Sequence, residues 1–344
     1  MQRHLNTLYV TLDKSYLHKN GAAIEVSHNG ETKLRVPFHN LDGIVCFGWD
    51  CCASAALMGA CAEANVTLSF HTPHGKFLAA SQGFTSGNIL LRRAQYRFSD
   101  SPDASLEIAR NIIAGKIANS RHVLLRAARE HSGKDINRCE SLIKTTKHLL
   151  RGMQQVKKAT DVEQLRGIEG EAASQYFSNF NCLLTNSQFT FSLRKRRPPT
   201  DPINALLSFL YSLLTHDCRS ACESCGLDAQ CGFLHAPLPG RPSLALDLME
   251  EFRAIFADRT AITLINRKQI KANHFKTKEN GAVYLKDEAR KIVLNHWQER
   301  KQVEIIHPLL EEKTTFGLLP HIQARLLARH LRDDLDAYPP YLIK

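Results

Sequence analysis

The sequence predicts an α+β protein, with a small β-sandwich-like domain over residues 1–84 and a larger all-α catalytic domain over residues 85–344. Two observations lead to this prediction. Short β-rich runs separated by Asn-Gly turns fill the first part, whereas apolar residues at helical spacing fill the rest. A chain of 344 residues is long enough for two domains, each with a core of its own.

The first part contains short runs rich in β-branched and aromatic residues. Asn20-Gly21 and Asn29-Gly30 predict two-residue hairpin turns, because both residue types tolerate positive φ. Small residues over Ala53–Ala64 predict one helix. Strands are expected at Leu8–Leu12, Ala23–Val26, Lys33–Val36, Gly43–Phe47, Val66–Phe70 and Phe77–Ala80.

Helical periodicity begins after a Ser- and Gly-rich linker at Ser81–Gly87. Apolar residues recur at helical spacing through Leu90–Tyr96, Ile108–Leu125 and Leu142–Leu150. The basic cluster Arg194, Lys195, Arg196 and Arg197 runs into a proline-rich stretch that cannot form a regular helix. This cluster is therefore predicted to lie in a loop just before the next helix.

Charge and composition limit the class of protein. The net charge is +11, yet residues 1–87 carry six Lys or Arg and six Asp or Glu, so the excess lies in residues 88–344. Such an excess suggests nucleic acid as a partner, or else a solvated basic surface. No apolar run reaches about 18 residues, and the first residues lack the apolar segment of a secretory signal. We therefore expect a cytoplasmic protein with reduced cysteines.

Glu169 stands on the apolar face of a predicted helix. Leu165, Ala172, Ala173 and Tyr176 lie three, four or seven residues away, on the same side. A buried carboxylate is costly unless it is paired with a cation or bound to a metal. Glu169 is therefore predicted either to bind a metal ion or to form a salt bridge with an arginine.

Two further segments carry candidate ligands. His235 ends the run Gly232-Phe233-Leu234-His235, where it is either a ligand or a structural histidine at the edge of the core. Asp247 and Glu250 are expected to begin a helix about 60° apart around its axis, on a side that the apolar stripe does not use. With Glu251 beside them they also fit a solvated acidic face near a helix start. One imidazole with two or three carboxylates suits Mg²⁺ or Mn²⁺ better than zinc.

The cysteines Cys218, Cys222, Cys225 and Cys231 offer a competing metal site. The first three continue the apolar stripe of Leu207, Tyr211 and Leu214 at helical spacing. Core packing is therefore the favoured interpretation for them, because cysteine packs well as a small buried apolar residue. Structural zinc is the alternative, although a tetrahedral site usually has turns between its ligand pairs. The same stripe favours a packing role for Tyr211.

These segments resemble the CRISPR-associated integrases that insert new spacers into a repeat array, most closely the type I-C branch. The resemblance covers essentially the whole chain. It depends on the segments from Arg35 to Val45, Gly87 to Tyr96, Pro198 to Leu207, Gly232 to His235 and Asp247 to Arg253.

The resemblance implies a metal site and a reaction. It places metal ligands at Glu169, His235 and Glu250, where an aspartate is common in other branches, and a supporting acid at Asp247. The implied reaction is transesterification, in which a DNA 3′-hydroxyl attacks a phosphodiester at a repeat border with Mg²⁺ or Mn²⁺. The basic residues from Arg194 to Arg197 would then contact DNA phosphates without reading sequence.

The resemblance also implies partners. These are a homodimer built on the neutral first domain, a small ferredoxin-like protein of the adaptation complex, and an iron–sulfur exonuclease that trims the DNA. Two alternatives remain open from the sequence: a metal-dependent nuclease acting on branched or single-stranded DNA, and a non-catalytic zinc-containing DNA-binding protein.

Overall fold

The computed structural model describes residues 6–41, 43–64, 66–73, 75, 77–81, 83, 89–131, 133, 135–195 and 198–343. The chain forms two compact units. The first comprises Met1–Ser86, Leu285–Ile305 and Thr315–Leu318, and the second comprises Gly87–Tyr284, Ile306–Thr314 and Leu319–Lys344. Segments close to residue 300, which the sequence assigns to the helical domain, thus belong to the first unit. Most of the predicted linker, together with Arg196 and Arg197, lies outside the described residues.

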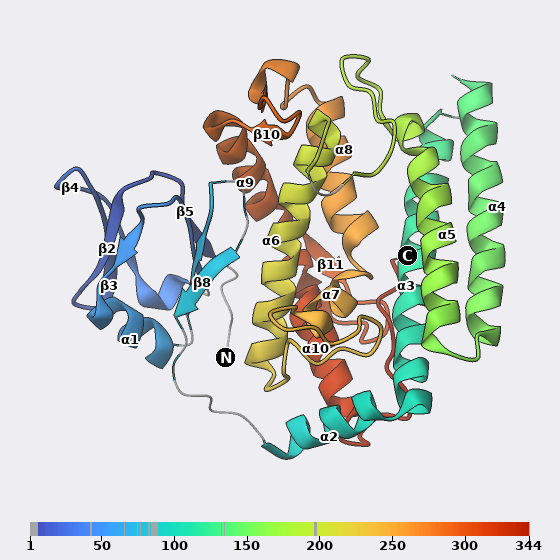
Figure 1. Cartoon of the computed structure of the whole chain (residues 1–344), viewed down its shortest axis with the longest axis horizontal. Helices are drawn as coiled ribbons and strands as arrows, with labels where there is room; N and C mark the ends of the chain where they lie inside the picture. Colours follow the sequence, from blue (N-terminus) through green and yellow to red (C-terminus); the bar gives the residue numbers. More distant parts are fainter. Residues whose placement is uncertain are drawn as a thin grey trace. The chain divides into compact units, whose positions relative to one another are not determined.

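The first unit contains two four-stranded sheets (Figure 1). One sheet has the order β1 (Thr7–Val10), β5 (Gly43–Phe47), β7 (Thr67–His71) and β8 (Phe77–Ser81). Its first three strands are parallel and β8 is antiparallel to β7. The other has the order β4 (Glu31–Pro37), β3 (Ala23–His28), β2 (Ser15–Asn20) and β6 (Cys52–Ala53). Strands β2, β3 and β4 form an antiparallel meander.

Both predicted hairpins are present, but only one of the two turns consists of the predicted residues. Asn29 and Gly30 have φ values of 52° and 80° and connect β3 to β4, as the two-residue turn requires. The other turn consists of Gly21 and Ala22 rather than Asn20 and Gly21, because Asn20 is the last residue of β2 and pairs with Ala23. Gly21 has a φ of 60°. Buried side chains from both sheets and from α1 (Ala55–Glu63) form one core, which includes Leu17, Ile24, Ile44, Leu57 and Leu68.

The second unit is mainly helical. Its long helices are α2 (Ile89–Asp100), α3 (Pro102–His131), α4 (Ile136–Lys158), α5 (Val162–Ser178) and α6 (Pro202–Ser224). Shorter helices follow at α7 (Ser243–Met249), the π-helix η3 (Arg253–Asp258), α8 (Arg259–Asn266) and α10 (Leu319–His330). None of the helices in the described part of the chain is long and apolar enough to cross a membrane.

Several short elements complete the chain. Four short strands in the C-terminal third were not predicted from the periodicity: β9 (Phe275–Thr277), β10 (Val283–Leu285), β11 (Glu304–Ile306) and β12 (Lys313–Thr315). Helix α9 (Asp287–Lys301) belongs to the first unit. The 3₁₀ turns are η1 (Phe38–Asn40), η2 (Phe180–Leu183), η4 (Ala272–His274) and η5 (Phe316–Leu318).

Helices α3, α4 and α5 pack side by side (Figure 1). Aspartates fix where the later helices start. Asp135, Asp161 and Asp201 each accept a hydrogen bond from the backbone N–H three residues on, which satisfies one of the free donors of the first turn. Pro202 then occupies the first position of α6, where its missing N–H costs nothing.

The prediction that Asp247 and Glu250 begin a helix is wrong. Helix α7 starts at Ser243 and ends at Met249, so Asp247 lies near its end and Glu250 is its C-cap. The interpretation as a solvated acidic face is also wrong, because Asp247 and Glu251 are 0% exposed and Glu250 is 4% exposed. A regular helical wheel fails here because a turn and a π-helix follow α7 and rotate the side chains away from their α-helical positions.

Candidate metal centre

Two of the predicted metal ligands contact the same lysine side chain. Glu169 comes from α5, Glu250 follows α7, and Lys116 reaches both from α3. The Lys116 Nζ atom lies 2.6 Å from Glu250 Oε2 and also contacts Glu169 Oε1. The Lys116 and Glu250 side chains are 11% and 5% exposed, and that of Glu169 is 26% exposed. Two carboxylates from distant segments therefore share one cation in a largely buried place.

Positive charge keeps Glu250 ionised. Burial by itself would raise the pKa of Glu250, but Arg253, Lys116 and His235 lower it, with a net result of about 2. Arg253 Nη1 lies 2.6 Å from Glu250 Oε1, on the other carboxylate oxygen from Lys116. Glu250 is thus a buried carboxylate that stays negatively charged at neutral pH.

Asp247 holds His235 in place. The Asp247 Oδ1 atom lies 2.6 Å from His235 Nδ1 and accepts the backbone N–H of the same residue at 2.9 Å. Its Oδ2 atom accepts the N–H groups of Phe233 and Leu234 at 2.6 and 2.9 Å. A carboxylate at Nδ1 fixes the tautomer in which Nδ1 carries the proton, so Nε2 offers its lone pair. Asp247 therefore holds the His235 ring and its loop, and its supporting role at a metal site stays a prediction.

The loop that carries His235 is shaped by a glycine and by α5. A Cβ atom on Gly232 would lie 2.7 Å from Asp247 Oδ2 and 2.8 Å from the Ser243 carbonyl carbon, so no other residue fits without a shift. The Arg166 guanidinium donates to the Leu234 carbonyl oxygen at 2.5 and 2.9 Å. Arg166 precedes Glu169 on α5 by about one turn, so the same helix positions Glu169 and the backbone beside His235.

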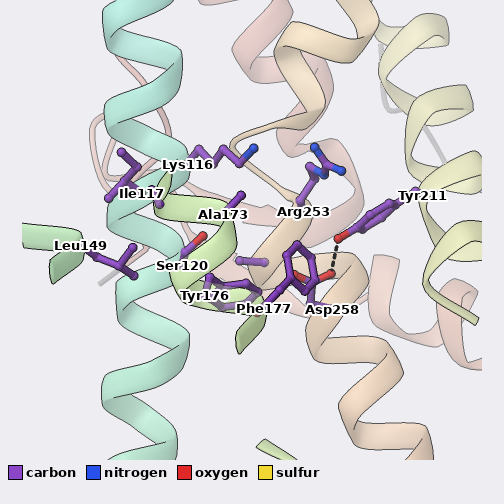
Figure 2. A pocket seen from close by; sticks show the side chains of 12 residues that line it. Lys116, Ile117, Ser120, Leu149, Ala173, Tyr176, Phe177, Tyr211, Arg253 and Asp258 are labelled. Atoms are coloured by element: carbon purple, nitrogen blue, oxygen red, sulfur yellow. Dashed lines mark hydrogen bonds between the residues drawn. The ribbon is translucent and has the colours of Figure 1, made fainter. Parts of the chain in front are cut away.

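A buried polar network extends away from these carboxylates. The Arg253 guanidinium lies over the Tyr211 ring, 4.5 Å from its centroid, and the Tyr211 hydroxyl donates to Asp258 Oδ1 at 2.7 Å. Figure 2 shows the ends of Lys116 and Arg253 on one side of a pocket, with Tyr211 and Asp258 joined by this hydrogen bond. The predicted packing role of Tyr211 is confirmed, since it is 8% exposed.

The residues of the basic cluster before α6 differ in their surroundings. Arg194 donates to Asn204 Oδ1 at 2.7 Å and also lies over the Tyr211 ring, 5.2 Å from its centroid. Lys195 is exposed. Arg196 and Arg197 lie outside the described residues.

Cys218 and Cys222 pack in the core as predicted, whereas Cys225 and Cys231 are only partly buried. Cys218 and Cys222 are 0% exposed within α6, and Cys225 caps that helix. Burial raises the pKa of both Cys218 and Cys222 well above the usual range, so these thiols stay protonated. Metals bind the thiolate form, so these two cysteines are poor ligands.

The donor set around Lys116 suits a hard divalent cation. In the chain as far as it is described, no three His, Cys, Asp or Glu side chains stand together as a finished ligand shell. Glu169 and Glu250 are instead drawn to the ammonium of Lys116. Glu250 Oε2 is buried and accepts no regular hydrogen bond there; its close neighbour is that cation. The two carboxylates fit Mg²⁺ or Mn²⁺ by charge and ligand type, and the His235 imidazole, which acts electrostatically on Glu250, is compatible with either ion.

Lys116, like Arg253, is a site residue that the sequence analysis missed. The sequence shows a lysine on an apolar stretch of helix: Ile112 and Ile113 lie four and three residues before it, and Ile117 follows it. All three isoleucines are buried. A charged residue on an apolar stripe is expected to have a partner, as the same reasoning predicted for Glu169.

Comparison with known families gives one clear match. Residues 8–299 match the family model described as "CRISPR associated protein Cas1". The chain is 51% identical to "CRISPR-associated endonuclease Cas1 1" of Chlorobaculum tepidum over 99% of both chains. It is also 51% identical to "CRISPR-associated endonuclease Cas1 2" of Rhodospirillum rubrum over the full length of both. A "CRISPR-associated exonuclease Cas4/endonuclease Cas1 fusion" of Geobacter sulfurreducens is 33% identical over 98% of this chain and 60% of the fusion.

Solved structures share the fold. "Casposase bound to integration product" superposes with a TM-score of 0.84 at 24% identity, covering 98% of this chain and 94% of that one. "Cas6-RT-Cas1--Cas2 complex" gives a TM-score of 0.82 at 24% identity, covering 98% of this chain and 36% of that one. The predicted mixed α+β fold, with a β-strand region followed by a helical domain, is confirmed.

Proposed function

The chain belongs to the Cas1 family of CRISPR-associated endonucleases, and from this premise we propose that it joins DNA 3′ ends to a CRISPR repeat array. Glu169, His235 and Glu250 would hold one Mg²⁺ or Mn²⁺ ion, and the type I-C branch is the one we propose. The observation that carries this proposal is the meeting of the Glu169 and Glu250 carboxylates at the Lys116 ammonium, the position of a cation.

The charge of the site supports a metal ion and a phosphodiester together. Glu169 and Glu250 supply two negative charges, which match a divalent cation. Lys116 and Arg253 supply two positive charges at the same place, which match the anionic phosphate that such an ion brings with it. When bound, the ion would polarise the phosphoryl oxygen and lower the pKa of the attacking hydroxyl.

The chain's own residues position these groups. Asp247 keeps the proton on His235 Nδ1 and leaves Nε2 for the ligand role. In the reaction, the 3′-oxygen of the incoming DNA forms a bond to phosphorus while the bond from that phosphorus to the leaving DNA oxygen breaks. The attacking hydroxyl loses its proton and the leaving oxygen gains one, so the number of phosphodiester bonds is unchanged. The site thus contributes alignment and charge, as is usual in phosphoryl transfer.

The partners belong to the same proposal. We propose a homodimer formed through the first domain (residues 1–84), a small ferredoxin-like adaptation protein, and an iron–sulfur exonuclease that trims the DNA. The names of the Cas4/Cas1 fusion and of the complex containing Cas1 and Cas2 support the last two. Exposed Lys195, with Arg196 and Arg197, is proposed to contact DNA phosphates, whereas Arg194 contributes through its contacts with Asn204 and Tyr211.

A joining assay tests the reaction. The protein is incubated with Mn²⁺, a plasmid that carries the repeat array, and short duplex DNA ending in a 3′-hydroxyl or a 3′-deoxy nucleotide. We expect joined products that need the 3′-hydroxyl and disappear with Glu169→Gln or His235→Ala. Glu171→Gln is the matched control, because Glu171 is an exposed glutamate on the same helix. Joining that persists in Glu169→Gln would refute the assigned ligands.

A nuclease that uses water is the second candidate. The names of the relatives favour it, since both of the relatives at 51% identity are called endonucleases. The same residues would serve, with water in place of the DNA hydroxyl. Strand cleavage in the assay above, with no joined product and no dependence on a 3′-hydroxyl, would identify this activity.

A further inference from the structure

Glu251 is a buried carboxylate beside Glu250 that the proposed reaction does not use. It is 0% exposed and accepts three hydrogen bonds from the end of the second unit. The Tyr338 hydroxyl donates to Oε1 at 2.5 Å, and the Tyr341 N–H and Gln323 Nε2 donate to Oε2 at 2.7 and 3.1 Å. Residues 338–343, here called the tail segment, are thereby fastened to the residue that follows Glu250.

The side chain of Asn119, in α3, makes hydrogen bonds to backbone atoms of the same two segments. Its Nδ2 atom donates to the carbonyl oxygens of Glu251 and Tyr341, both at 2.8 Å. Its Oδ1 atom accepts the N–H of Ile343 at 3.0 Å. Asn119 is 1% exposed, and its amide makes three hydrogen bonds in all, two of them with the tail segment.

The tail segment also packs against the residue before Lys116. A Cβ atom on Gly115 would lie 2.9 Å from Pro340 Cβ and 3.3 Å from Glu251 Cγ. The Tyr341 ring packs against that of Phe252 at a tilt of 36°, with 5.8 Å between the ring centroids. The tail segment therefore contacts the chain next to two of the charged residues of the site, Lys116 and Glu250.

The backbone at Glu250 lies between two different kinds of helix. Helix α7 ends at Met249 and the π-helix begins at Arg253, so residues 250–252 lie in a turn. Its backbone bonds are short-range ones, from Glu250 N–H to the Asp247 oxygen at 3.2 Å and from Phe252 N–H to the Met249 oxygen at 3.0 Å. The direction of the Glu250 side chain then depends on what holds this turn. Hydrogen bonds to the carbonyl and the side chain of Glu251 fix the backbone one residue away from Glu250.

We propose that the tail segment is a positioning element of the metal centre, which holds Glu250 and Lys116 in place through Glu251, Asn119 and Gly115. This inference depends on the proposed function only in taking Glu250 as a metal ligand. Outer residues that orient a ligand typically change metal affinity by 10–100-fold. We therefore expect loss of the tail contacts to weaken Mn²⁺ binding by about tenfold, with little change in overall secondary structure.

Tyr338→Phe tests the proposal with the loss of a single hydroxyl. Mn²⁺ alone is titrated calorimetrically into the full chain, and amide hydrogen exchange of residues 249–253 is measured in parallel. Tyr96→Phe is the matched control, because it also removes a hydroxyl bonded to a carboxylate, at 2.9 Å on Asp228. Tyr338→Phe should weaken Mn²⁺ binding by about tenfold and speed exchange at residues 249–253, whereas Tyr96→Phe should do neither.

Two further measurements separate the possible failures. If Glu250→Gln leaves Mn²⁺ binding intact, the assigned ligand is wrong, and the hydrogen exchange alone then decides whether the tail segment holds the turn. If Glu250→Gln abolishes binding while Tyr338→Phe matches wild type in both readouts, the positioning role is refuted. If Tyr338→Phe does not fold, the test is made on the wild-type chain. Coupling between the metal site and the tail segment is reciprocal, so Mn²⁺ binding must slow hydrogen exchange of the Tyr341 amide. An unchanged Tyr341 amide would overturn the proposal.

Discussion

Replacing Asp247 with asparagine tests how the imidazole of His235 is held. The Asp247 carboxylate is fully buried and accepts four hydrogen bonds, two on each oxygen. Asparagine has nearly the same shape but only one acceptor oxygen, and its NH₂ group would face two donors. Two of the four bonds are therefore lost, whichever way the amide turns.

The size of the effect follows from this count. A hydrogen bond to a charged group contributes about 1.5–3 kcal/mol, so the loss of two should cost about 3–6 kcal/mol of folding free energy. The amide also cannot hold the proton on His235 Nδ1 as a carboxylate does. Metal affinity should then fall by about 10–100-fold, the usual effect of removing the group behind a histidine ligand.

Urea unfolding in EDTA measures the stability, and calorimetric titration of Mn²⁺ measures the affinity. The titration is run in the cold with the folded fraction checked by circular dichroism, because the expected loss is large compared with the stability of a typical domain. Asp228→Asn is the matched control. Asp228 also accepts a backbone N–H in the segment between α6 and α7, that of Gln230 at 2.8 Å, but it makes no bond to His235.

The two readouts can each contradict the reasoning. If Asp247→Asn loses no more stability than Asp228→Asn, the four hydrogen bonds contribute less to the free energy of unfolding than their geometry predicts. A large loss of stability with unchanged Mn²⁺ affinity would show that Asp247 holds the loop but does not position a ligand.

Three other changes have defined outcomes. Lys116→Met leaves two buried carboxylates without their shared cation, so the metal-free protein should lose about 3–5 kcal/mol in urea unfolding. Its Mn²⁺ affinity should rise, because no ammonium competes; an unchanged affinity would contradict this. Gly232→Ala forces a methyl group to within 2.7 Å of Asp247 Oδ2 and should cost about 1–3 kcal/mol, read as a lower Tm. Burial raises the pKa of Asp258 to about 6, despite the hydrogen bond from Tyr211. The folded state therefore binds this proton more tightly than the unfolded state, and stability should fall as the pH rises from about 4 to about 6. Asp258→Asn should flatten the unfolding free energy over that range; equal slopes in variant and wild type would refute the assignment.

Local rules predicted those parts of the fold that depend on neighbours in sequence. The Asn29-Gly30 turn follows from two residues that tolerate positive φ, and the burial of Cys218 and Cys222 follows from helical spacing. The surroundings of Asp247 and Glu250 could not be predicted in this way. The helical wheel assumes an α-helix that continues, but α7 stops at Met249.

Lys116 shows a second limit of the sequence. Periodicity tells which face of α3 is buried, but not which residue of another helix that face meets. The contacts of Lys116 with Glu169 and Glu250 are set by the packing of α3 against α5 and the π-helical turn. The cost of burying an unpaired charge predicts that Lys116 has an acidic partner, but it does not identify which glutamate or aspartate this is.

Glu250 and Glu251 show how surroundings separate two adjacent, buried glutamates. Burial raises the pKa of both, but the partners of each carboxylate decide its net pKa. Arg253 and Lys116 are cations, and they lower the pKa of Glu250 to about 2. Glu251 receives hydrogen bonds only from neutral groups, which oppose burial without cancelling it, and its pKa is raised to about 8. The carboxylate that faces cations therefore remains a charged group suited to a metal ion. The one that faces neutral donors is suited to holding the tail segment, so neighbouring residues of one type take different roles because of the charge of the groups around them.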